Sequence, residues 1–89
     1  MSLQVWKFPL KNTGHSVVSM PEKSIIVSVQ SQRGVVTLWA VCDTERAIDK
    51  RGFYVTLTGE SLPERYVLKS IGTVLLDGDD FVLHVFEVL

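Results

Sequence analysis

Apolar residues recur at every second position along most of this chain, the spacing of a β-strand with one buried face. β-Branched valine, isoleucine and threonine are abundant within these alternating segments. Short clusters of glycine, proline, asparagine and aspartate interrupt the alternation. The pattern therefore predicts about seven short strands, at residues 3–9, 15–20, 24–31, 35–43, 53–59, 67–77 and 81–89.

Turn residues separate the predicted strands. Gly34 can adopt a positive φ angle between two β-branched runs, so a hairpin is predicted around Gln32-Arg33-Gly34. A second hairpin turn is predicted at Asp77-Gly78-Asp79-Asp80. Pro21 ends the second strand, and Gly72 predicts a bulge or bend within the sixth. The polar segments 43–52 and 60–66 are each expected to hold a brief turn or a single helical turn.

These elements indicate a mainly β fold with at most one or two helical turns. Strands joined by short turns pair mostly as antiparallel hairpins, which favours a small antiparallel β-sandwich or a part-open barrel. A chain of 89 residues is expected to form one domain, spanning residues 1–89. The core of so short a chain is modest, so homo-oligomerisation is also expected.

The last predicted strand, FVLHVFEVL, is apolar on both faces. A strand buried on both sides is expected to run through the middle of its sheet. His84 shares a face with Val82, Phe86 and Val88, whereas Glu87 lies on the other face. The two polar side chains therefore do not form a pair, and Glu87 is interpreted as a rim or interface carboxylate.

Charge and hydropathy narrow the range of partners. The net charge is −1, acidic and basic residues are interspersed, and the longest basic run is Lys50-Arg51. Duplex binding requires several phosphates to be neutralised together, so no duplex nucleic acid is expected as a partner. No apolar run could cross a bilayer, and the first residues lack the pattern of a signal peptide, so no membrane partner is expected.

The sequence contains no motif typical of a cofactor site or of a catalytic nucleophile. The single cysteine and the two histidines lack the spacing of a metal site, and no phosphate-binding or dinucleotide-binding glycine motif is present, so no cofactor is expected. Cys42 lies among apolar neighbours, which favours a buried structural thiol over a nucleophile paired with His84. A lone cysteine also fits a reducing cytoplasm.

The candidate ligand- or partner-binding residues are Trp39, Thr58, Gly59 and His84. Trp39 offers a ring for stacking, Thr58 and Gly59 offer hydroxyl and backbone donors, and His84 can contact an anion. The alternative is structural, with Trp39 in the core and His84 bonded to a backbone carbonyl. Alternate residues of the segment 54–58 form either the lining of a shallow cleft or a solvated sheet face.

Several short motifs carry a family resemblance. The chain opens with Trp6-Lys7-Phe8 and continues with Met20-Pro21, Leu38-Trp39-Ala40-Val41, Thr58-Gly59, Ile71-Gly72-Thr73 and His84-Val85-Phe86-Glu87. This series resembles a family of small uncharacterised phage and prophage proteins over nearly the whole chain. The family often continues its Thr-Gly with His-Pro, where this chain has Glu60-Ser61. The resemblance implies a phage origin and an accessory role, without a catalytic mechanism.

The leading hypothesis is a non-enzymatic phage-type binding protein that acts in the cytoplasm of the infected bacterial host. It would antagonise host defence by occluding a host protein or by sequestering a small signalling ligand between protomers. The alternative is a phage structural or assembly protein that oligomerises through sheet edges. An enzyme ranks third, because no nucleophile–base pair is visible.

Overall fold

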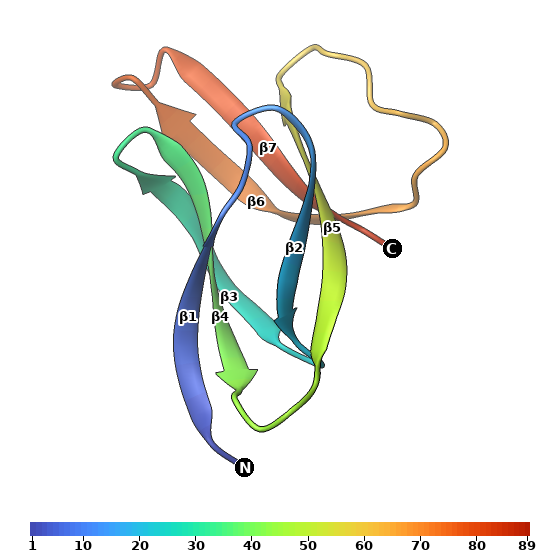
Figure 1. Cartoon of the computed structure of the whole chain (residues 1–89). Helices are drawn as coiled ribbons and strands as arrows, with labels where there is room; N and C mark the ends of the chain where they lie inside the picture. Colours follow the sequence, from blue (N-terminus) through green and yellow to red (C-terminus); the bar gives the residue numbers. More distant parts are fainter.

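The structure, a computed structural model, describes residues 1–89 as seven β-strands without a helix (Figure 1). The strands are β1 (Leu3–Pro9), β2 (Gly14–Pro21), β3 (Ile25–Gln32), β4 (Val35–Asp43), β5 (Ile48–Leu57), β6 (Leu68–Leu76) and β7 (Phe81–Val88). Two antiparallel sheets result, with strand orders β1-β4-β3 and β2-β5-β7-β6. The predicted mainly β fold is confirmed as a small two-sheet sandwich that does not close into a barrel. A helix with the length and hydropathy to cross a bilayer is absent.

The core lies between the inner faces of the two sheets. In β4 every second residue from Val36 to Cys42 is fully buried, as the alternation predicts. From the other sheet, the most buried residues come from β2, β5 and β7: Met20, Pro21, Phe53, Val55, Leu83 and Val85. β7 lies between β5 and β6, so the prediction that FVLHVFEVL occupies the middle of a sheet is confirmed.

The predicted turns occur where the glycines and aspartates indicated them. Arg33 and Gly34 both have positive φ angles, 52° and 78°, which gives the β3–β4 hairpin the twist of its strands. At the β6–β7 turn, Asp77 is also in the left-handed region, with φ 51°. The predicted bulge is present, because the register of β6 against β7 shifts between Ser70 and Gly72. There a Cβ atom on Gly72 would lie 3.0 Å from Cγ1 of Val29, so the two sheets approach closely at this glycine.

Each of the two polar segments contains a brief turn, which was one of the two expectations, and neither contains a helical turn. β5 begins at Ile48, within the polar segment expected to turn, and its first residues pair with β2 from Pro21 to Val17. This pairing satisfies backbone groups that would otherwise need other partners, which outweighs the weak helical preference of a polar segment. The segment after β5 is an irregular loop, Thr58–Val67, in which the amide of Tyr66 donates to the carbonyl of Pro63.

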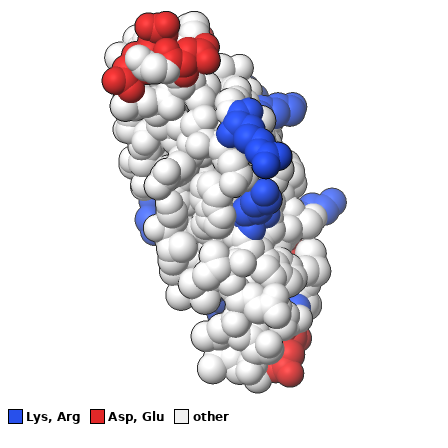
Figure 2. Space-filling view, turned by 90° about the vertical axis from the view of Figure 1, so that its left-hand side faces the viewer, with Lys and Arg blue, Asp and Glu red and all other residues white.

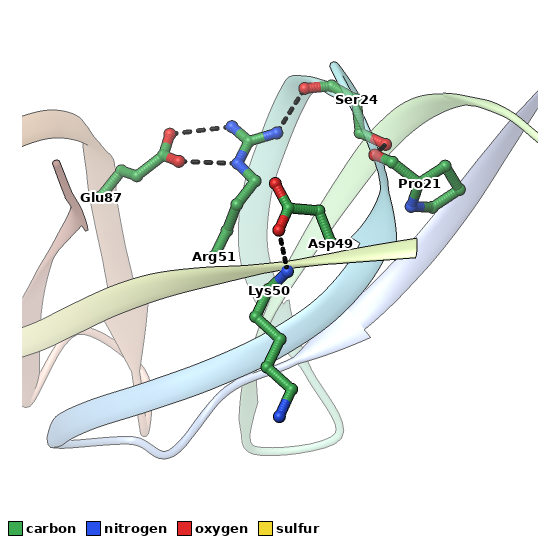
Figure 3. Close-up of polar contacts among 6 residues, drawn as sticks. All are labelled: Pro21, Ser24, Asp49, Lys50, Arg51 and Glu87. Atoms are coloured by element: carbon green, nitrogen blue, oxygen red, sulfur yellow. Dashed lines mark hydrogen bonds and ion pairs between the residues drawn. The ribbon is translucent and has the colours of Figure 1, made fainter. Parts of the chain in front are cut away.

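Glu87 is not the rim carboxylate that the sequence suggested. Its side chain lies on the inner face of β7 and is 14% exposed. The Nε and Nη2 atoms of Arg51 donate to its two carboxylate oxygens at 2.7 and 2.9 Å, while Nη1 donates to the carbonyl of Ser24 (Figure 3). The hydrogen bonding to Glu87, together with the negative charge of that carboxylate, raises the pKa of Arg51 above its ordinary value. Because Ser24 immediately precedes β3, the cluster ties one sheet to the start of the other.

Candidate functional site

Both histidines and two tyrosines of the chain gather at the outer face of the β2-β5-β7-β6 sheet. The register places His15 of β2 opposite Tyr54 of β5, and His84 of β7 opposite Thr56 of β5. Because neighbouring residues such as Phe53 and Val55 point into the core, these side chains point outward. The second tyrosine, Tyr66, reaches the same face from the loop Thr58–Val67. We call this surface the histidine–tyrosine face.

One half of the face is built around His84. Thr58 directly follows β5, and its Oγ1 lies 2.6 Å from Nε2 of His84, with the direction of donation set by the tautomer. Gly59 has a φ angle of 90°, a conformation that suits glycine, and its amide forms no hydrogen bond within the protein. Glu60 stabilises the turn, because its carboxylate accepts the amide of Leu57 at 3.0 Å. The half therefore presents a hydroxyl, a free amide and an imidazole.

The other half is aromatic. The rings of His15 and Tyr66 are stacked, with centroids 5.2 Å apart and planes inclined by 27°. The centroid of the Tyr54 ring lies 6.1 Å from that of the Tyr66 ring, and the guanidinium of Arg65 lies 4.7 Å from the centroid of the Tyr66 ring. The loop is held by the amide of Leu89, which donates to the carbonyl of Val67. This half offers aromatic surface next to a cation.

Three of the four predicted site residues lie together, and one does not. Thr58, Gly59 and His84 share the first half of the histidine–tyrosine face. Trp39 lies on the outer face of the other sheet, opposite Lys7 of β1 and Ser28 of β3. No single site of one protomer contains all four residues.

The sequence reasoning missed His15, Arg65 and Tyr66. His15 lies in β2, and its pairing with β5 has no local signal in the sequence. Arg65 and Tyr66 lie in an irregular loop, where periodicity says nothing about which way a side chain points. A partial signal was present, because the alternation of residues 54–58 did identify a face that carries polar groups.

Open hollows border the face at both ends. One of about 390 Å³ is lined by Leu57, Thr58, Asp80, Phe81 and Val82. Another of about 590 Å³ is lined by His15 together with residues of the β1–β2 connection and the start of β2. Their volumes fall within the range of small-ligand sites, although neither is a closed chamber. A ligand on this face would remain partly exposed unless a second molecule covered it.

A third hollow, of about 370 Å³, adjoins the cluster of Figure 3. Its polar lining includes Ser24, Arg51 and Glu87, with Lys69 and Ser70 from β6. All three guanidinium nitrogens of Arg51 already donate to Glu87 or Ser24. We therefore interpret this cluster as a structural tie and not as a binding group.

The remaining candidates for chemistry lie apart. Cys42 is fully buried on the inner face of β4, where its thiol donates to the carbonyl of Ala40. His84 is on the outer face of the opposite sheet, so the two side chains do not meet. No group of three or more histidine, cysteine, aspartate or glutamate side chains is placed to hold a metal ion.

The whole chain matches one known protein family. A family model described as a domain of unknown function, DUF7352, matches residues 1–89. The chain belongs to the DUF7352 family. No curated protein and no solved structure is detectably similar to it. The family description assigns no ligand, so the function of this DUF7352 chain must be argued from its own side chains.

Proposed function

We propose that this protein is a non-enzymatic accessory binding protein of phage type that antagonises host defence by sequestering a small anionic signalling ligand. The observation that carries the proposal is the convergence of Thr58, Gly59 and His84 with the stacked rings of His15 and Tyr66 on one open face. The proposed site of action is the cytoplasm of the infected bacterium.

The two halves of the face match two chemical parts of a nucleotide. In the tautomer in which Nε2 of His84 donates to Oγ1 of Thr58, the Thr58 hydroxyl and the Gly59 amide are free to donate to a phosphate, which accepts several hydrogen bonds at once. The rings of Tyr54 and Tyr66 suit a base, because stacking tolerates any base. Along β5, Thr56, the residue opposite His84, is two residues from Tyr54, roughly 7 Å, whereas the donor Thr58 is four residues from Tyr54, roughly 13 Å. The distance from the donors to the rings therefore suits a nucleotide with more than one phosphate or a dinucleotide.

Two further observations support an accessory role. The motifs from Met20-Pro21 to the His84-Val85-Phe86-Glu87 ending resemble small phage and prophage proteins. The histidine–tyrosine face also offers donors and stacking surface without a third group that would orient His84 as a catalytic base. These groups therefore suit the capture of a ligand better than its chemical conversion. Trp39 is not part of this proposed site.

The test is a binding screen against linear and cyclic nucleotides. A ligand present at a hundred times its Kd stabilises the folded state by about 2.7 kcal/mol, which a thermal-shift assay detects. Calorimetry on each hit then compares the wild type with Thr58→Val and His84→Ala. Thr44→Val is the matched control, since the Thr44 hydroxyl makes no hydrogen bond and lies in the β4–β5 turn.

We expect at least one nucleotide to bind, with weaker binding in Thr58→Val and His84→Ala and unchanged binding in Thr44→Val. No stabilisation by any nucleotide would refute sequestration. Specific capture of one host protein in that case would favour the occlusion route of the same antagonist role. Large defined assemblies in light scattering would instead favour the alternative, a phage structural or assembly protein.

A further inference from the structure

The outer face of the β1-β4-β3 sheet carries a cluster of exposed apolar side chains. The register aligns Val5 of β1, Val41 of β4 and Ile25 of β3 in one row across all three strands. Val5 is 60% exposed and Ile25 is 64% exposed. Around this row lie further apolar residues, and together they form what we call the Trp39 patch: Leu3, Val5, Ile25, Val27, Trp39 and Val41.

A β-bulge enlarges the patch. Ile26 is opposite Ala40 and Ser28 is opposite Trp39, so Val27 is an extra residue in β3. Ile26 packs against the core, whereas Val27 is 55% exposed. An apolar residue is thus presented to solvent at a position that contributes nothing to the core of its own protomer.

The uncharged area is broad. Figure 2 shows the molecule from the left-hand side of Figure 1, where β1 and the β3–β4 turn lie. On this side a wide region has no Lys, Arg, Asp or Glu residue. The whole outer face of the sheet, three strands of about eight residues, has a projected area of roughly 400 Å², and the Trp39 patch occupies about half of it. Contiguous apolar patches of a few hundred Å² on a small protein mark interaction sites.

We infer that the Trp39 patch is the interface of a two-fold symmetric dimer of this chain. Only 16 of the 89 residues are buried within one protomer, so a second copy adds substantially to a small core. When the two whole sheet faces meet around the patch, their projected areas sum to about 800 Å², and the relief of the side chains brings the accessible area toward the roughly 1,200 Å² at which specific interfaces begin. A reversible dimer follows, rather than an obligate one.

The charges at the ends of the patch favour a copy of the same chain as the occupant. Lys7, beside Trp39, and Asp43, opposite Leu3, lie at opposite ends of the Trp39 patch along the strands. Asp43 already accepts the amides of Ser2 and Glu45, and Nε of Arg46 lies 3.7 Å from its carboxylate. A two-fold axis that crosses the strands at the Val5–Val41–Ile25 row places Lys7 of each copy near Asp43 of the other, as a second cation beside that carboxylate. The same surface is then complementary to itself, as an isologous interface requires.

The dimer leaves the histidine–tyrosine face free on both protomers, because that face belongs to the other sheet. The inference therefore does not depend on the proposed ligand. It also places Trp39 in the dimer interface, whereas Trp39 is not part of the proposed ligand site.

Sedimentation equilibrium from low micromolar to near-millimolar protein tests the inference. The variant is Val5→Glu, and the control is Val17→Glu. Val17 lies in β2, an edge strand of the other sheet, and is 59% exposed. Both positions are open to solvent, so both variants should fold, which circular dichroism checks. We expect a concentration-dependent dimer for the wild type and Val17→Glu. In Val5→Glu the Kd should rise by more than about tenfold, because dimerisation would bury a carboxylate.

A wild type that stays monomeric over this range overturns the inference, and a host protein would then be the occupant to seek. Equal loss of dimer in Val5→Glu and Val17→Glu overturns it as well, because the contact would not be specific to the Trp39 patch. An assembly larger than a dimer would also contradict it.

Discussion

Removing the carboxylate of Glu87 should destabilise the fold far more than removing an exposed one. In Glu87→Gln the guanidinium of Arg51 keeps its bond to Ser24 and can keep one bond to the amide oxygen, but it loses the second bond and the negative charge of the carboxylate. Lys69 pairs with position 87 across β6 and β7, so a second cation lies on the neighbouring strand. The substitution leaves a half-buried positive charge without its counter-ion.

The magnitude follows from the exposure of the pair. Breaking a fully buried ion pair costs about 3–5 kcal/mol, whereas a surface pair is worth about 0–1 kcal/mol. The side chains of Arg51 and Glu87 are 22% and 14% exposed, which places the pair between these limits. Glutamine retains one acceptor oxygen, so we expect a loss of about 2 kcal/mol in the free energy of unfolding. For a domain of this size Tm should fall by roughly 8–16 °C.

Urea denaturation followed by tryptophan fluorescence measures this loss directly. Glu64→Gln is the control, because Glu64 lies exposed in the Thr58–Val67 loop without an ion pair, and it should change stability by less than about 0.5 kcal/mol. The double variant Arg51→Met/Glu87→Leu should lose less than the sum of its single changes, since neither charge is left alone. If Glu87→Gln proves no more costly than Glu64→Gln, water screens the pair and the reasoning is wrong.

Three further outcomes are expected. Deleting residues 85–89 should abolish cooperative unfolding in circular dichroism melts, because β7 is central and Val85 is fully buried; a truncated chain that still melts cooperatively would contradict this. Gly72→Ala should cost about 1–3 kcal/mol in urea denaturation, since its Cβ would crowd Val29 at 3.0 Å, and an unchanged midpoint would mean that the sheets shift freely. The pKa of Asp43 should lie below 3.8 by NMR titration, because its carboxylate accepts the amides of Ser2 and Glu45. The stability that Asp43 contributes is then present above pH 3.8 and is lost as the pH falls through the lowered pKa.

The strands could be predicted because their signals are local. Alternation and turn residues identified β3, β4 and the hairpin at Arg33-Gly34, and the glycine at position 72 identified the bulge. The start of β5 could not be predicted, because a polar segment becomes a strand there only through its pairing with β2. Glu87 was misplaced for the same reason, since its partner Arg51 lies in a segment that had no predicted strand. Long-range pairing decided each of the errors.

The candidate site shows the same division between local and long-range information. Thr58 and Gly59 follow the end of β5, and their approach to His84 depends on the pairing of β5 with β7. Successive hairpins would place β6 beside β5, so the hairpin pattern does not predict this pairing. His15 meets Tyr66 only because β2 pairs with the far side of β5 and an irregular loop folds back over the sheet. Trp39 was grouped with the others on chemistry alone, yet β4 belongs to the opposite sheet. Residue type therefore identifies which side chains can bind, and sheet order determines which of them bind together.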